Sequence, residues 1–198
     1  MLLCAITNRR LEGSTFFTQR AALLARARLW AERGVDLIQL REKDLPEAEL
    51  MSLAKEMRQV IQSAGTSTRL IVNAALHVAL AAKADGVHLP SAAPFTRERL
   101  WASAACHTEE QVTLARNGKA DCILFAPIFG KQLEAGDSLP GVGLEALAAA
   151  CRVAAPVPVL ALGGVTAQNA AVCVAAGASG IAAIRLFYGP PAQWEHLH

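Results

Sequence analysis

The sequence predicts an α/β protein with a (β/α)8 barrel, or TIM barrel, forming one compact domain over residues 1–198. Short apolar runs alternate with helical patterns along the chain and make eight strands, which is the order of elements in such a barrel. A similar helix-to-strand turn also recurs before every second strand, at residues 33–36, 84–86, 120–122 and 177–180. An open doubly wound sheet is the alternative, but no glycine-rich dinucleotide fingerprint follows the first strand.

The first half of the chain is predicted to hold four strands and three helices. Residues 15–33 are rich in Ala, Leu and Arg and predict an amphipathic helix, which Gly34 can end in the left-handed conformation. Pro46 fits the first turn of the next helix, because apolar residues recur at helical spacing as far as Ser63. The remaining predicted elements are strands at 1–7, 35–40, 69–72 and 85–89, and a short helix at 74–83.

The second half repeats the alternation. Residues 101–106 form a weak strand of small residues, preceded by at most a short helix at 96–100. Thr108 can cap the following helix, with Gln111 at the reciprocal position of a capping box. The other predicted elements are strands at 122–125, 157–162 and 180–184, helices at 144–153 and 166–176, and a Gly- and Pro-containing loop at 130–143.

Composition argues against several classes of protein. The formal net charge is only +2, and no basic run is interleaved with aromatic residues, so we expect no nucleic-acid partner. Every apolar run is interrupted well before the ~18 residues that would span a membrane, and the N-terminus lacks the pattern of a signal peptide. An odd number of cysteines without paired short spacing favours reduced core thiols over a zinc site, and hence a cytoplasmic location.

The stretch at residues 39–43 places a neutral amide and two cations where a buried strand ends. Ligands of α/β proteins bind at the carboxyl ends of parallel strands. Gln39, Arg41 and Lys43 alternate, so an extended chain directs all three to one side, either the barrel mouth or the outer surface. At the mouth they predict an anionic small molecule, whereas the alternative is a solvated charged loop around Glu42.

A second candidate site follows the last two strands. Backbone N–H groups at Gly163 and Gly164 can approach phosphate oxygens closely, and barrels often bind phosphate between the loops after strands seven and eight. Arg185, at the end of the eighth strand, can add a bidentate cation. The alternative is a tight turn beside a surface arginine.

Other polar residues are weaker candidates. Asn73 ends the third strand, where it can bond a heterocycle or form a turn. His88 lies inside an apolar strand, as a satisfied core histidine does, and His107 precedes a helix, where it can be a proton carrier or a capping residue. Lys131 lies in the long loop after the sixth strand, which is typical of a lid over a barrel mouth. A dedicated Mg²⁺ site would need carboxylates, yet alanines end the third and fourth strands, so no metal ligand is assigned.

Short stretches across nearly the whole chain match one known family in order and in type. These stretches are residues 39–43, 73, 84–89, 107–108, 127–129, 143–144 and 161–165. They resemble the thiamine phosphate synthase/TenI family, and together they are specific, although any one alone is not. The family is a (β/α)8 barrel, in agreement with the elements predicted above.

The resemblance implies substrates and contact residues. Synthases of this family join a hydroxymethylpyrimidine diphosphate to a thiazole phosphate and release diphosphate with Mg²⁺. The positions that would contact the pyrimidine and the diphosphate are Gln39, Arg41, Lys43 and Asn73. The positions that would bind the thiazole phosphate are Gly164 and the end of the eighth strand, Ile184 and Arg185, beside the Gly163 already assigned to phosphate.

The sequence departs from the synthase pattern at the metal positions. The family's Asp after the Asn is Ala74 here, and its second Mg²⁺-binding Asp aligns with Ala93. Losing both carboxylates removes stabilisation of the departing diphosphate worth on the order of several kcal/mol. The TenI branch, whose characterised activity is tautomerisation of thiazole phosphate, needs no metal and is the closer match. Its loop His aligns with Pro127, so acid/base chemistry would fall to Lys131, His107 or His88.

The leading hypothesis is a TenI-like protein of thiamine biosynthesis that binds a thiazole phosphate and tautomerises it. One alternative is a degenerate thiamine phosphate synthase, the only reading that implies Mg²⁺ as a cofactor. The other is a non-catalytic regulator that binds a phosphorylated ligand without converting it. In each case the expected partner is a small phosphorylated heterocycle, with no nucleic acid and no membrane, and the sequence is compatible with a homo-oligomer.

Overall fold

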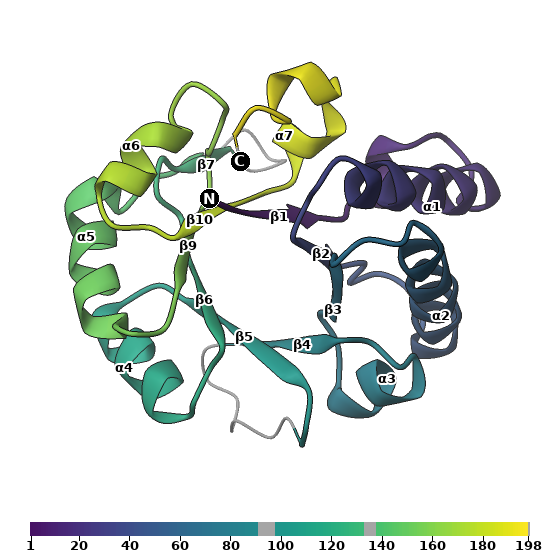
Figure 1. Cartoon of the computed structure of the whole chain (residues 1–198), viewed down its shortest axis with the longest axis horizontal. Coiled ribbons are helices and arrows are strands. Elements are labelled where there is room, and N and C mark those ends of the chain that lie inside the picture. Colours follow the sequence, from purple (N-terminus) through teal and green to yellow (C-terminus); the bar gives the residue numbers. More distant parts are fainter. Residues whose placement is uncertain (91–97, 133–137, 198) are drawn as a thin grey trace.

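The computed structural model describes residues 1–90, 98–132 and 138–197. Its main sheet is a closed barrel of parallel strands in the order β1-β10-β9-β6-β5-β4-β3-β2, with the helices outside it (Figure 1). The barrel strands are β1 (Leu2–Ile6), β2 (Leu37–Leu40), β3 (Arg69–Val72), β4 (Gly86–Leu89), β5 (Trp101–Cys106), β6 (Cys122–Phe125), β9 (Val159–Leu162) and β10 (Gly180–Ala183). The predicted (β/α)8 fold is therefore confirmed.

The helices follow the strands around the outside of the barrel. They are α1 (Phe16–Glu32), α2 (Glu47–Ser63), α3 (Leu76–Ala81), α4 (Glu109–Asn117), α5 (Gly143–Ala154), α6 (Ala170–Ala175) and α7 (Arg185–Tyr188), with short 3-10 helices η1 (Arg9–Leu11) and η2 (Pro191–Gln193). None of the helices in the described part of the chain is long and apolar enough to cross a membrane.

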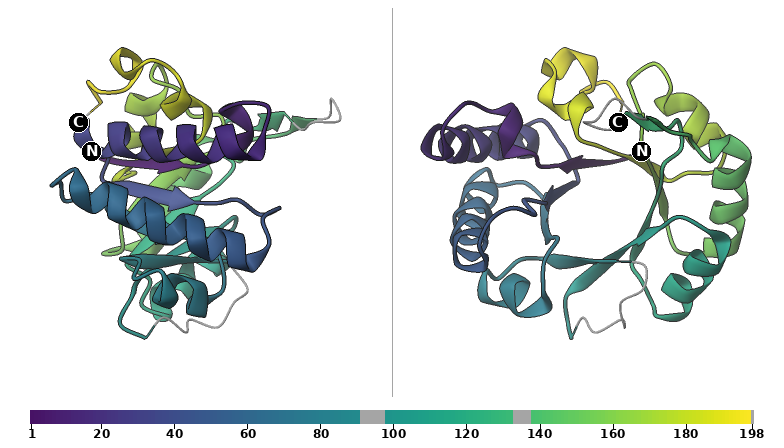
Figure 2. Two further views of the ribbon diagram at one scale, coloured as in Figure 1. Left: turned by 90° about the vertical axis from the view of Figure 1, so that its right-hand side faces the viewer. Right: turned by 180° about the vertical axis from the view of Figure 1, so that it is seen from behind.

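Two predictions about the second half are wrong. The loop predicted at 130–143 contains an antiparallel hairpin, β7 (Lys131–Gln132) with β8 (Ser138–Leu139), because two-residue strands are too short to show a pattern. The hairpin projects beyond the barrel at the end opposite the N-terminus (Figure 2). Arg185 does not end a strand but begins α7, because β10 stops at Ala183. Of the short helix predicted at 96–100, residues 98–100 form a turn, and the first two lie outside the described residues.

The recurring turn has a structural cause. In three of its four copies, the Asp carboxylate accepts a hydrogen bond from the backbone N–H of the second residue of the preceding barrel strand. Asp36 bonds the N–H of Leu3, and Asp85 bonds the N–H of Leu70, both at 2.8 Å. Asp121 does the same for Ala102 at 2.8 Å, in the turn before β6. These carboxylates satisfy backbone donors at the N-terminal end of the barrel, away from the mouth.

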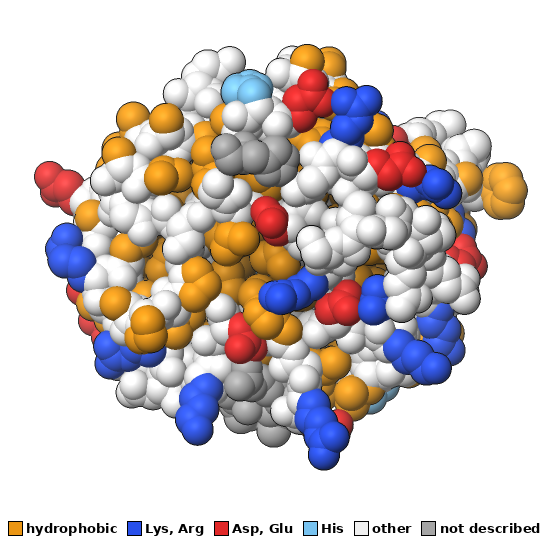
Figure 3. Space-filling model, in the orientation of Figure 1, with side chains coloured by type: hydrophobic (Ala, Val, Ile, Leu, Met, Phe, Trp, Pro, Cys, Tyr) orange, Lys and Arg blue, Asp and Glu red, His pale blue; other side chains and the backbone are white. Residues whose placement is uncertain are grey.

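An apolar cluster fills the barrel interior. Its members are Cys4, Ile6, Leu37, Ile71, Cys122, Leu124, Leu160 and Ala182, with Leu2 and Trp101 packed against it. Figure 3 shows the end of the barrel at which the N-terminus lies, where hydrophobic side chains gather near the centre among charged ones. All five cysteines are unpaired, as predicted, and four of them are buried. Because this cluster fills the barrel interior, a site at the carboxyl ends of the strands, where ligands of such barrels bind, would lie on top of it.

Candidate active site

Four polar side chains lie above the apolar cluster, toward the carboxyl ends of the strands. Gln39 and Asn73 each come two residues after a member of the cluster, so strand alternation directs both inward. The Asn73 amide donates to the Gln39 carbonyl at 3.5 Å, which is a long contact. His88 on β4 lies 2.8 Å from the Ser103 hydroxyl on the neighbouring β5. Gln39 and Ser103 are 2% exposed and His88 is 6% exposed, so together these side chains make a buried polar floor.

His88 is neutral at physiological pH. Burial, together with the positive charges of Arg41 and Lys43, lowers its pKa from 6.5 to about 4. A ring with so low a pKa is a poor proton acceptor near pH 7, but it can still hydrogen-bond a ligand. The structure therefore favours the reading of His88 as a satisfied interior histidine over a general base.

Arg41 and Lys43 lie near the polar floor. Strand alternation directs Arg41 to the same side of the chain as Gln39, and the positive charges of both cations contribute to the lowered pKa of His88. Arg41 is half-buried and Lys43 is exposed, and within the part of the chain that the structure describes neither makes an ion pair. The two cations can therefore bind an anion above the polar floor.

The residue between the two cations is not part of a solvated loop. Glu42 is only 3% exposed, and its carboxylate accepts hydrogen bonds from the backbone N–H of Arg9 at 3.0 Å and from the Arg9 guanidinium at 3.1 Å. The same guanidinium donates to both oxygens of Asp44, at 2.6 and 2.7 Å. This bidentate contact holds the pKa of the Asp44 carboxyl well below its usual range. Sequence reasoning missed Arg9 and treated Glu42 only as part of a solvated loop.

His107 stands at the carboxyl end of β5. Its Nδ1 lies 2.7 Å from the carbonyl oxygen of Ala126, and a carbonyl can only accept, so Nδ1 carries the hydrogen and Nε2 keeps its lone pair. Its backbone N–H donates to the Gln111 side chain at 2.7 Å, while Thr108 caps α4 through the Gln111 N–H at 3.3 Å. The ring is exposed and oriented, as a proton acceptor at the rim would be.

The two glycines after β9 are required by a close approach between loops. Gly163 and Gly164 have φ of +96° and +68°, and the N–H of Phe129 donates to the carbonyl of Gly163 at 3.0 Å. A Cβ on Gly163 would lie 2.7 Å from the Pro127 Cα, and one on Gly164 would lie 2.8 Å from the Phe129 Cβ. These contacts alone account for both glycines, so phosphate binding there stays a prediction.

The other predicted phosphate residues lie on the next strand around the barrel. β9 and β10 are hydrogen-bonded neighbours, with Leu162 opposite Ala182, so Gly163 and Ile184 follow at the same end. Ile184 is half-buried against the apolar cluster, whereas Arg185 is exposed on α7. Lys131 lies in β7, in the hairpin that projects from the mouth.

The described donors at the mouth do not suit Mg²⁺. No group of three or more His, Cys, Asp or Glu side chains that could hold a metal occurs among residues 1–90, 98–132 and 138–197. Asn73 is followed by Ala74, and Ala93 lies outside the described residues. The carboxylates next to the cations, Glu42 and Asp44, are both engaged by Arg9.

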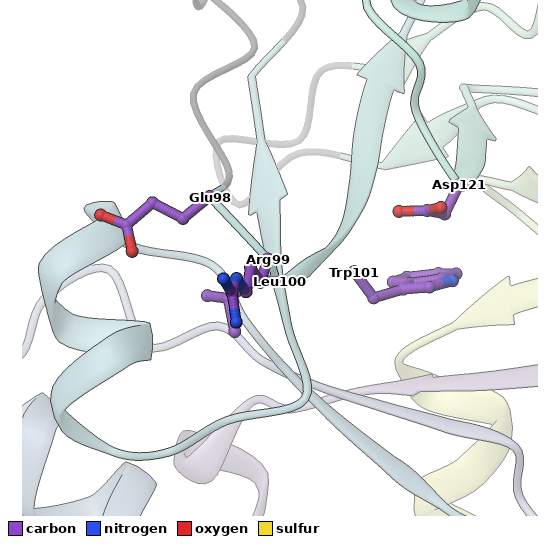
Figure 4. A pocket seen from close by; sticks show the side chains of 5 residues that line it. All are labelled: Glu98, Arg99, Leu100, Trp101 and Asp121. Atoms are coloured by element: carbon purple, nitrogen blue, oxygen red, sulfur yellow. The ribbon is translucent and has the colours of Figure 1, made fainter.

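A hollow of about 280 Å³ lies at the other end of the barrel. It is lined by Glu98, Arg99, Leu100, Trp101 and Asp121, at the starts of β5 and β6 (Figure 4). The Trp101 indole lies close beside the Asp121 carboxylate, while Glu98 points away from both. Active sites of (β/α)8 barrels are built at the carboxyl ends of the strands, so this hollow is not a candidate for the chemistry.

Comparison with known proteins decides the family. A family model described as thiamine monophosphate synthase matches residues 3–187. The chain belongs to this family. This family belongs to thiamine biosynthesis and binds phosphorylated heterocycles.

Relatives of known name cover most of the chain. A putative thiamine-phosphate synthase 2 from Aquifex aeolicus is 36% identical, over 93% of this chain and 96% of its own. A thiamine-phosphate synthase from Methanoculleus marisnigri is 40% identical, over 82% of this chain and 79% of its own. The solved structure of a thiamine phosphate pyrophosphorylase from Pyrococcus furiosus superimposes with a TM-score of 0.76 at 28% identity, over 92% of this chain and 85% of that one.

Proposed function

We propose that the barrel mouth binds a thiazole phosphate and that the chain catalyses its tautomerisation, a proton transfer. The observation that carries the proposal is the composition of the mouth. Two cations without acidic partners among the described residues stand above a neutral polar floor, next to an alanine at the position of a metal carboxylate. Such a site suits an anionic heterocycle, and its described residues do not supply the carboxylates that a diphosphate-releasing metal would use.

In this proposal His107 is the catalytic base. Its Nε2 is available at the rim, and its Nδ1–H is held by the Ala126 carbonyl, an arrangement that fixes the orientation and the tautomer of the ring. His88, kept neutral by burial, and Gln39 would hydrogen-bond the heterocycle, while Arg41, Lys43 and the loops after β9 and β10 would neutralise the phosphate.

Calorimetric titration with thiazole phosphate tests the binding step. Binding in the millimolar range or tighter is expected, and no heat at millimolar ligand would overturn the proposal. The chemical step is followed by ultraviolet absorbance as the non-aromatic tautomer becomes aromatic. His107→Asn should lower kcat by roughly 10²-fold or more, because a general base usually contributes that much to the rate, with little change in KM.

A second candidate, thiamine phosphate synthase, is favoured by the names of the relatives. It predicts that hydroxymethylpyrimidine diphosphate and thiazole phosphate give thiamine phosphate with Mg²⁺, and that a chelator abolishes this turnover. The tautomerase proposal predicts no such product. Binding of thiazole phosphate without either conversion would instead support a non-catalytic regulator, in which Arg185→Ala weakens binding and there is no turnover to lose.

A further inference from the structure

The turn between β2 and α2 carries charges of alternating sign, and the structure separates them. Residues 41–44 read Arg, Glu, Lys, Asp. Both acidic side chains bond the Arg9 guanidinium, whereas neither cation has an acidic partner in the described part of the chain. Such a separation is unexpected for an ordinary surface loop, where neighbouring opposite charges are free to pair with one another.

The Arg9 contacts join the ends of two neighbouring strands. The N–H of Thr7 donates to the carbonyl of Gln39 at 2.9 Å, and the N–H of Arg41 donates back to the Thr7 hydroxyl at 2.9 Å. Glu42 then accepts from both the backbone and the guanidinium of Arg9. The turn that carries the cations is therefore fastened to the segment after β1 at successive residues.

A third loop holds the same segment from the other side. The Tyr188 hydroxyl, at the end of α7, accepts a hydrogen bond from the N–H of Asn8 at 2.7 Å. Tyr188 also lies near Glu42, because the Glu42 charge contributes to the raised pKa of the phenol, behind burial as the main cause. The segments after β1, β2 and β10 are thus linked through residues 7–9.

We propose that Arg9 and Glu42 are positioning residues, which hold Arg41 and Lys43 toward the barrel interior to receive the anionic group of the ligand. Arg41 directly follows β2, where side chains still alternate, so burying Glu42 beneath Arg9 places Arg41 on the opposite side of the chain. A turn begins at Lys43, and the N–H of Leu45 donates to the carbonyl of Glu42 at 3.2 Å, so the anchored Glu42 also fixes where the turn that carries Lys43 starts. Engaging Glu42 and Asp44 elsewhere also keeps these carboxylates from pairing with the cations, which would neutralise the site. The inference rests on one part of the proposed function, namely that an anion binds at the mouth.

Inorganic diphosphate, titrated calorimetrically at fixed ionic strength, is the probe for this inference, because it needs only the cations and no heterocycle. Glu42→Gln keeps the shape of the side chain and removes its charge, and it should weaken diphosphate binding about tenfold. In an Arg41→Ala background the same change should weaken binding about threefold or less, because one of the cations that Glu42 orients is already gone. Glu56→Gln is the matched control, since Glu56 bonds the Arg20 guanidinium on the outer helices and should leave binding unchanged.

Unfolding curves separate positioning from a general loss of structure. Should Glu42→Gln fail to fold, Arg9→Met/Glu42→Met replaces the buried pair with apolar side chains of similar size, which buried pairs often tolerate. If positioning is right, this double variant unfolds cooperatively and still binds diphosphate at least fivefold more weakly. An equal loss of affinity in the wild-type and Arg41→Ala backgrounds, or wild-type affinity in the double variant, would overturn the inference. Failure of the wild type to bind diphosphate would overturn it too, whereas the proposed function fails on thiazole phosphate itself.

Discussion

Replacing Gly164 by alanine tests the close approach of the loop after β6 to the loop after β9. Two effects add in this variant. The φ of +68° is left-handed, which costs an alanine about 1–2 kcal/mol, partly offset by about 0.4–1 kcal/mol from the less flexible unfolded chain. The new Cβ also lies 2.8 Å from the Phe129 Cβ, and such overpacking typically costs about 1–3 kcal/mol.

Gly65 offers a matched control within the same chain. It has the same φ of +68°, but nothing lies within 4 Å of a Cβ built on it. Gly65→Ala should therefore lose about 0–1.6 kcal/mol, and Gly164→Ala should lose about 1–3 kcal/mol more. Urea unfolding followed by circular dichroism measures both, and the difference corresponds to roughly 2–4 °C in Tm per kcal/mol for a chain of this size. Equal losses in the two variants would refute the claim that loop contact requires Gly164.

Three further outcomes follow from the buried groups. His88 has a folded pKa of about 4, below its value of 6.5 in the unfolded chain, so the unfolded state takes up the proton first and stability falls between about pH 6.5 and 4, by up to ~3 kcal/mol. Urea unfolding at pH 7 and pH 4.5 should show a smaller pH difference in His88→Gln than in the wild type. Asp36→Ala leaves the N–H of Leu3 without its partner and should cost about 1–3 kcal/mol in the same assay, against no measurable loss for the exposed Glu49→Ala. Burial raises the pKa of Cys106 to about 11 and that of Cys122 to about 12, so iodoacetamide at pH 8 should alkylate half-buried Cys151 before either, as peptide mass spectrometry would show.

The fold could be predicted because its signals are local. Each barrel strand is a short apolar run bounded by a turn, and the recurring Asp before β2, β4 and β6 is visible without knowing that it bonds the adjacent strand. The strands in the structure are shorter than the apolar runs from which they were predicted. Val35 is buried and apolar but precedes β2, because Asp36 turns toward Leu3. The β7–β8 hairpin could not be predicted, because two-residue strands are too short to show an alternating pattern.

The site could be predicted only in part, because its key contacts join distant residues. Strand alternation was enough to expect Gln39 and Arg41 on one side of the chain. Arg9 could not be linked to Glu42 and Asp44, since it precedes them by 33 and 35 residues and sequence alone does not pair such charges. Ser103 was missed as well, although it is the one hydroxyl in a strand of small residues opposite His88.

The Asp carboxylates at the starts of β2, β4 and β6 have a consequence for how this barrel can vary. They add hydrogen bonds between neighbouring strands at the end where the N-terminus lies, and these contacts involve no residue at the mouth. An alanine can therefore occupy position 74, at the end of β3, without loosening the sheet. The residues that stabilise the barrel and the residues of the site lie at opposite ends of the same strands, so the site can change while the fold is kept.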